Sequence, residues 1–272
     1  MAFFPLTSKY GAQDISPTRN KPGRIVGVVP VSGPNGQPGS AFKFRGRPDS
    51  FIEFPNKGGL DTKNSITILG YVNPESPGPI FNYNPRGFGM HVWMGRRNVL
   101  FARFVQRNKK FTRPVATNRI KPGTWHWVGA TYDRNTGYAR LYVDSRKTAE
   151  RYLGGIKLAT NYPVRMGARV GDRRFFRGKI TCVQVYNVAL TRQQIRAARK
   201  NCFRPGWLGS SIVYSYLKEL LRNERDLFQK EFVLHNICDF HLGTKLLFTL
   251  HDTRMIFHTR TRISFRMKTG MT

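Results

Sequence analysis

Short runs of β-forming residues recur between turn signals along residues 41–186, and this spacing restricts the fold more than any other feature. Strands at such spacing are typical of an all-β sandwich, in which two antiparallel sheets pack face to face. The expected strands are residues 41–44, 51–54, 65–72, 89–94, 99–107, 125–132, 138–144, 164–166 and 179–186. The sequence therefore predicts a two-sheet antiparallel sandwich.

The clearest local prediction is a hairpin made by residues 125–132 and 138–144. In the second strand Ala139, Leu141 and Val143 share one face, because side chains alternate across a strand. The connection at 133–137 ends in Gly137, which can supply a positive φ. We therefore expect one core face and one aromatic, basic face.

Outside these strands the chain changes character. Residues 1–40 are rich in proline and glycine and indicate loops, with a possible edge strand at 25–31. Residues 191–200 predict a short closing helix, because Thr191 followed by Gln194 forms a capping-box pattern. Residues 1–206 are thus one expected domain, with its core at about 20–204. The tail at 207–272 is expected to hold one amphipathic helix, from 210 to about 232, and to be partly disordered.

The charge of the chain is strongly one-sided. It carries 46 Lys and Arg against 15 Asp and Glu, a net charge of +31. Residues 1–206 hold 36 of the cations and 9 of the acids, so the basicity belongs to the expected β domain. A field of this strength attracts polyanions. No apolar run reaches the length of a membrane helix, so no membrane insertion is expected.

Three segments together resemble a known family. They are Trp-His-Trp-Val-Gly-Ala-Thr-Tyr-Asp at 125–133, Gly-Tyr-Ala-Arg-Leu-Tyr-Val-Asp at 137–144, and the run at 176–191 that contains Cys182. In order and spacing they resemble the laminin G-like, concanavalin A-like jelly-roll superfamily, on the side of its pentraxin-like members. The resemblance covers roughly residues 40–204 and leaves out 207–272.

The resemblance implies a jelly-roll arrangement of the two sheets and a secreted or cell-surface domain. Members commonly recognise glycans or matrix proteins, sometimes through calcium, and some occur in the organic matrices of invertebrate skeletons. Catalysis is not implied. We therefore expect a non-enzymatic extracellular binding or adhesion domain, whose partners are sulfated or acidic glycans or acidic matrix proteins.

The resemblance also implies a disulfide between Cys182 and Cys202, with Cys238 left free. Two buried thiols are the alternative. A disulfide requires an oxidising compartment, whereas the first residues show no signal-peptide pattern. We therefore expect an extracellular protein whose sequence is truncated at its start.

The residues that would bind an anionic partner are arginines and lysines grouped on and near the expected strands. Alternation places Arg103 and Arg107 on one face of the strand at 99–107, as a cationic stripe. The alternative is an ordinary solvated surface. The candidate ligand-binding residues are Arg103, Arg107, Lys109, Lys110, Arg113, Arg173, Arg174, Arg177 and Lys179.

Calcium is the one cofactor that the resemblance raises, and its candidate ligands are Asp61, Asp144 and Asp172. A calcium ion needs about six to eight oxygen ligands, yet lysine or arginine follows closely after each of the three. Each is also explained as a turn or capping residue. We therefore expect no cofactor, with calcium as the lesser alternative.

Two other functions are weighed against binding. A lectin-like glucanase needs two carboxylates facing each other across a cleft, and no E-x-D-x-E strand is present. An intracellular nucleic-acid-binding protein would fit the charge, but no known recognition motif occurs, so nucleic acid is the less favoured partner. The tail group of His235, Cys238, Asp239 and His241 matches no standard zinc spacing.

Overall fold

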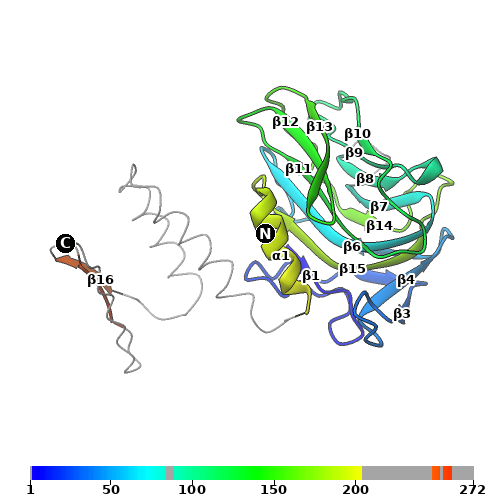
Figure 1. Cartoon of the computed structure of the whole chain (residues 1–272), viewed down its shortest axis with the longest axis horizontal. Helices are drawn as coiled ribbons and strands as arrows, with labels where there is room; N and C mark the ends of the chain where they lie inside the picture. Colours follow the sequence, from blue (N-terminus) through cyan, green and yellow to red (C-terminus); the bar gives the residue numbers. More distant parts are fainter. Residues whose placement is uncertain (1, 84–88, 204–246, 252–253, 259–272) are drawn as a thin grey trace. The chain divides into compact units, whose positions relative to one another are not determined.

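A computed structural model describes residues 2–83, 89–203, 247–251 and 254–258 (Figure 1). The chain divides into two units, Met1–Gly206 and Trp207–Thr272. In the second unit the described residues form one antiparallel pair, β16 (Leu247–His251) with β17 (Arg254–His258). The helix expected at 210–232, the free Cys238 and the histidine group beside it lie outside the described residues.

The first unit contains two antiparallel sheets. Sheet 1 has eight strands, in the order β13 (Arg146–Tyr152), β12 (Tyr138–Val143), β11 (His126–Tyr132), β6 (Ile66–Ser76), β15 (Arg177–Tyr186), β4 (Ala41–Arg45) and β3 (Val29–Val31), with β1 (Ala2–Phe4) also paired to β15. Sheet 2 has seven strands, in the order β10 (Val115–Thr117), β9 (Leu100–Arg103), β8 (His91–Met94), β7 (Gly78–Tyr83), β14 (Val164–Met166), β5 (Phe51–Phe54) and β2 (Arg24–Val26). The two-sheet jelly-roll sandwich is confirmed.

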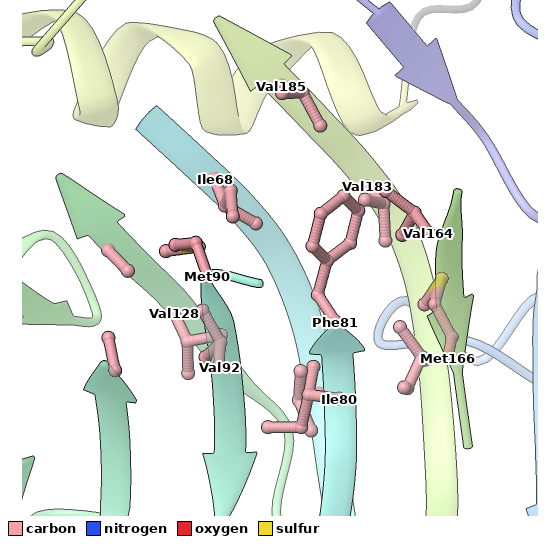
Figure 2. Packing of buried hydrophobic residues seen from close by; sticks show 14 of the residues in the cluster. Ile68, Ile80, Phe81, Met90, Val92, Val128, Val164, Met166, Val183 and Val185 are labelled. Atoms are coloured by element: carbon pink, nitrogen blue, oxygen red, sulfur yellow. The ribbon is translucent and has the colours of Figure 1, made fainter. Parts of the chain in front are cut away.

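The core lies between the two sheets. Figure 2 shows Ile68 and Val128 of sheet 1 in the same cluster as Phe81, Val92 and other residues of sheet 2. Each of these side chains is at most 6% exposed. Full burial of such a side chain contributes about 1.5–3 kcal/mol. The alternate side chains of sheet 2 point away from this core, and they build the site described below.

The predicted hairpin and closing helix both form. β11 pairs with β12, and Gly137 has a φ of +72° in the connection between them. The helix α1 (Arg192–Lys200) begins at Thr191, whose hydroxyl accepts from the backbone of Gln194 while the Gln194 side chain accepts from the Thr191 backbone. This reciprocal pair is the predicted capping box.

The N-terminal residues are part of the core, and the prediction of loops there was wrong. β1 pairs with Val183, Gln184 and Val185 of β15, and all of its residues are buried. Phe4 packs against Phe54 with ring centroids 4.1 Å apart. The strand consists of the three apolar residues at 2–4. It was not predicted because the residues that follow are rich in proline and glycine, which indicate loops. The core therefore begins well before residue 20.

Three further strands of the first unit, β7, β10 and β13, were not predicted, and one predicted strand is shorter than expected. β7 starts at Gly78, whose φ is +152° and whose Cβ would lie 2.2 Å from the backbone nitrogen of Phe176. Only glycine fits this close approach. The strand predicted at 99–107 ends at Arg103, so alternation does not carry Arg107 to the same face.

Candidate functional site

The predicted basic residues do not form one stripe. Arg103 and Arg174 both lie on the outer side of sheet 2, where Arg103 is the cross-strand neighbour of His91 and Arg174 lies over the Trp93 ring. Arg177 and Lys179 belong to β15 of sheet 1, where Glu75 pairs with Arg177 and with Lys43 of the neighbouring strand. The candidate cations are therefore divided between the two sheets.

Four other candidates, Arg107, Lys109, Lys110 and Arg113, follow β9 in the connection to β10. Lys109, Lys110 and Arg113 are exposed. Arg107 is half-buried and donates to both carboxylate oxygens of Asp61, at 3.0 and 2.6 Å, and to the Leu158 carbonyl at 3.2 Å. The Arg107 guanidinium lowers the pKa of Asp61 below its usual range. Arg107 therefore links the connection between β9 and β10 to the segments that contain Asp61 and Leu158.

We expect Arg107→Ser to lower the free energy of unfolding by about 2 kcal/mol, because it leaves a half-buried carboxylate without its charged donor. Lys110→Ser is the matched control, and an exposed substitution of this kind changes stability by about 0.5 kcal/mol or less. Urea unfolding of both variants measures the difference. Equal stabilities would show that the Arg107 to Asp61 pair contributes little.

The outer side of sheet 2 carries one continuous row of polar side chains. Residues that pair across neighbouring strands lie side by side on the same face of a sheet. The strand register therefore places in one line Arg103 (β9), His91 (β8), Asn82 (β7), Arg165 (β14), Glu53 (β5) and Arg24 (β2). We call this line the transverse row.

At the β14–β5 end of the transverse row, Arg165 has a carboxylate partner. The Arg165 Nε lies 2.7 Å from the Glu53 carboxylate, and its guanidinium lies 4.2 Å from the centre of the Phe51 ring. Arg24 lies over the same ring, at 5.2 Å. Here one carboxylate of the chain satisfies the arginine that stands beside it.

At the β9–β7 end of the transverse row, donors outnumber acceptors. Among residues 2–83 and 89–203, Arg103 Nε, Asn82 Nδ2 and Arg169 Nε are buried and have no hydrogen-bond acceptor. Asn82 is 0% exposed, and its Oδ1 accepts from the indole nitrogen of Trp93 at 3.4 Å. A buried donor without an acceptor costs about 1–3 kcal/mol. This end of the row therefore favours a ligand with acceptor oxygens.

His91 stands between Arg103 and Asn82 as a neutral side chain. Burial lowers its pKa to about 4, and the positive charges of Arg103, Arg169 and Arg174 add to this effect. Its Nδ1 lies 3.0 Å from the Gly89 carbonyl, so the proton of the neutral ring belongs on Nδ1. His91 Nε2 is then an acceptor.

Aromatic rings lie beside the transverse row. Trp93 of β8 and Phe101 of β9 are cross-strand neighbours, with ring centroids 6.3 Å apart. The guanidinium of Arg174 lies 4.5 Å from the Trp93 ring, and Trp93 is only 2% exposed. Arg174 is itself bound by Asp172, whose oxygens accept at 2.9 Å from its Nε and at 2.6 Å from its Nη2.

Asp172 is one of the three calcium candidates, and each of the three binds donors of the protein. Hydrogen bonds from Arg174 lower the pKa of Asp172 to about 2, and Arg169 lies 3.6 Å from the same carboxylate. Asp61 accepts from Arg107 and from Thr160 at 2.8 Å. The described part of the chain holds no cluster of three or more potential metal-ligating side chains.

Asp144, the third candidate, occupies the turn between β12 and β13. Its carboxylate accepts from the Trp127 backbone at 3.0 Å and lies 3.0 Å from Nδ1 of His126. Burial opposes its ionisation, but these two hydrogen bonds and the positive charge of Arg199 together lower the pKa of Asp144. The φ values of Asp144 and Ser145, +51° and +64°, suit a two-residue hairpin turn.

Cys182 of β15 and Cys202 after α1 form a disulfide, with their Cα atoms 5.4 Å apart. A pocket of about 390 Å³ lies beside it, lined by the N-terminal loop and residues 34–40. Several of its hydroxyl and amide groups bond within the chain, as Ser40 does to the Gln37 carbonyl at 2.6 Å. None of the buried side-chain N and O atoms that lack a hydrogen-bond partner in residues 2–83 and 89–203 belongs to the lining of this pocket.

Sequence reasoning found Arg103 and Arg174 but missed the residues that complete the site. His91 was not among the candidate residues, and Asn82 lies on a strand that was not predicted. Arg169 and Trp93 were not assigned a role. Alternation within 89–94, which places His91 and Trp93 on the face opposite Val92, is the signal that could have identified two of them.

The fold is a two-sheet sandwich of the jelly-roll type. The family model of the concanavalin A-like lectin/glucanases superfamily matches residues 45–196, and the chain belongs to this superfamily. The resemblance seen in the sequence is thus confirmed. No curated protein sequence matches the chain. None of the described helices is long and apolar enough to cross a membrane.

Several solved structures share the fold. The binding domain of botulinum neurotoxin serotype G has a TM-score of 0.58 at 14% identity, covering 72% of this chain and 49% of that one. The ligand-binding domain of serotype D, in complex with N-acetylneuraminic acid, has a TM-score of 0.59 at 12% identity, covering 74% and 50%. The binding domain of Paraclostridial mosquitocidal protein 1 has a TM-score of 0.53 at 13% identity, covering 64% and 46%. The chain spans about half the length of these domains, and the likeness concerns the fold.

Proposed function

We propose that this protein is a non-enzymatic extracellular binding domain that recognises acidic glycans or acidic matrix components through its basic surface. The observation that carries the proposal is the state of the acidic side chains in residues 1–206. All nine acidic side chains have partners within the domain, and the same domain carries 36 lysines and arginines. The surplus of positive charge is therefore available to a ligand.

The partners of these acids can be named. Six form ion pairs with lysine or arginine, and these are Asp49, Glu53, Asp61, Glu75, Glu150 and Asp172. Asp144 lies 3.0 Å from Nδ1 of His126. Asp14 accepts from the backbone of Phe3, and Asp133 accepts from the Thr136 hydroxyl. A glycosidase needs two carboxylates facing each other across a cleft. Acids that already hold cations or donors of the chain favour binding over catalysis.

The disulfide supports an extracellular location, because such bonds persist in oxidising compartments. Residues 1–206 would be the binding domain. A fold of this kind can bear an acidic sugar, as the serotype D domain in complex with N-acetylneuraminic acid indicates. At 12% identity that complex gives the class of ligand to test and no residue assignment.

Heparin chromatography of the full chain tests the proposal. We expect Lys110→Ser/Arg113→Ser to weaken heparin binding about fivefold, because each exposed ion contact contributes about 0.2–1 kcal/mol. Retention should also fall steeply with salt, since the Debye length is about 10 Å at 0.1 M and about 3 Å at 1 M. The elution salt and a binding constant at fixed salt are the measurements.

The matched control is Arg196→Ser/Lys200→Ser, which removes the same charge from exposed positions on α1. Equal weakening by both double variants would show that net charge alone governs heparin binding. Tighter binding to duplex DNA than to heparin would contradict the preference for glycans.

A further inference from the structure

The β9–β7 end of the transverse row, together with Arg169, contains a group of donors that the chain does not satisfy. We call Arg103, His91, Asn82 and Arg169 the acidic-sugar subsite. Three of its buried donors have no acceptor among the described residues. Arg103 and Asn82 flank His91 in the strand register, and Arg169 pairs with Asp172, whose other partner Arg174 lies over Trp93 on the same face. These donors would be satisfied by an anion whose acceptor oxygens lie in one plane with each other, as in a carboxylate.

The other end of the same row shows which group would meet that requirement. Arg165 stands next to Asn82 in the strand register and is satisfied by the Glu53 carboxylate at 2.7 Å. Arg103 is the corresponding arginine on the far side of His91, and no carboxylate of the described chain reaches its Nε. Arginine binds a carboxylate through two parallel hydrogen bonds.

A carboxylate of the chain already binds at the border of the subsite. Asp172 lies 3.6 Å from Arg169 and is held by Arg174. The geometry of these arginines therefore suits a carboxylate. Asp172 leaves Arg169 Nε unbonded, and Arg103 Nε has no acceptor either.

The surroundings favour a sugar over a simple carboxylic acid. Phe101 lies beside the row and is partly exposed, so its aromatic ring offers an apolar surface to the C–H face of a sugar ring. His91 Nε2 can accept from a hydroxyl group. Arg174 covers the Trp93 ring, and the Arg174 side chain is itself 61% exposed.

We propose that the acidic-sugar subsite binds the carboxylate of one acidic sugar residue, with Arg103 and Arg169 as the charged donors. The neighbouring Asn82 amide donates to the same carboxylate, and His91 accepts from an adjacent hydroxyl. This inference rests on the proposed function, since it names the chemical group that the basic domain recognises.

The test uses the full chain and three small probes: 3′-sialyllactose, lactose, and lactose 3′-sulfate. We expect 3′-sialyllactose to bind and lactose to bind at least tenfold more weakly in calorimetric titrations. Arg103→Gln and Arg169→Gln should each weaken 3′-sialyllactose binding about tenfold or more, because a hydrogen bond to a charged group is lost. Arg103→Lys keeps the charge without the paired donors and should also weaken binding.

The controls separate this inference from the proposed function. Arg24→Gln changes the other end of the row, and Lys110→Ser/Arg113→Ser changes the exposed cations; both should bind 3′-sialyllactose within about twofold of the unmodified chain. If heparin binds as proposed but 3′-sialyllactose does not, the subsite is refuted and the proposed function stands. If neither binds, both fail.

Two further outcomes would overturn the assignment. Lactose 3′-sulfate binding as tightly as 3′-sialyllactose would contradict a carboxylate-specific subsite. Unchanged 3′-sialyllactose affinity in Arg103→Gln and Arg169→Gln would place the binding site elsewhere. Circular dichroism of each variant reports its folding, and Arg103→Lys supplies the decisive measurement if Arg103→Gln fails to fold.

Discussion

Replacing Cys182 and Cys202 together by alanine is expected to lower the free energy of unfolding by about 3 kcal/mol. The disulfide closes a loop with a sequence separation of 20 residues. In the chain-entropy model, closing such a loop removes about 3 kcal/mol of conformational freedom from the unfolded state. Urea unfolding followed by circular dichroism measures the change.

The disulfide also fastens α1 to the outer side of sheet 1. The Ile195 carbonyl accepts from the Trp127 indole at 3.2 Å, and the Ala198 carbonyl accepts from Gln184 at 3.1 Å. A helix of nine residues is marginal by itself. We therefore expect the double variant to lose part of its helical signal and to change its tryptophan fluorescence before the sheets unfold.

Cys238→Ala is the control, because the resemblance leaves this cysteine unpaired. It should unfold at the same urea concentration as the unmodified chain. Peptide mapping without reductant should recover the peptide linked through Cys182 and Cys202. A double variant within about 0.5 kcal/mol of the unmodified chain would show that the helix is held by packing alone.

The sandwich could be predicted from sequence because its central hairpin has strong local signals. Alternation in β12 identifies the core face, and Gly137 marks the turn. Thr191 and Gln194 mark the start of α1 through a contact between neighbours in sequence. Each of these signals depends on residues within a few positions of one another.

The strands that were missed depend on distant partners. β1 is a strand because β15 offers a free edge to Phe4 and its neighbours, 179 positions away in the Phe4–Val183 pair. β7 contains Pro79, which sequence rules assign to turns. β13 is mostly exposed and charged, so it lacks an apolar alternation. Tertiary pairing overrides local propensity in all three.

The candidate site was harder to predict than the fold for the same reason. Arg103 and His91 are adjacent because of the β8–β9 register, which no local pattern determines. Arg107, four residues after Arg103, was assigned to the same stripe but pairs with Asp61, 46 positions away. Composition indicates that cations are in excess. Only the three-dimensional structure shows which cations already have a carboxylate.

His91 provides the last prediction, a pH dependence of stability. Its pKa is about 4 in the folded protein, against a usual value of 6.5, mainly because it is buried. Between these values the unfolded chain binds a proton that the folded protein does not, so stability falls as pH falls. A shift of this size corresponds to roughly 3 kcal/mol, present above pH 6.5 and lost by about pH 4.

His91→Gln removes this titration while keeping a neutral polar side chain beside Arg103 and Asn82. The variant is expected to be less stable than the unmodified chain at pH 7, since it replaces a buried ring. Its further loss between pH 7 and pH 4 should be smaller, because the protonation of His91 no longer contributes to it. The difference between the two pH profiles, measured by urea unfolding, isolates His91. Parallel profiles would mean that His91 is hydrated in solution, and that the donors around it are hydrated as well.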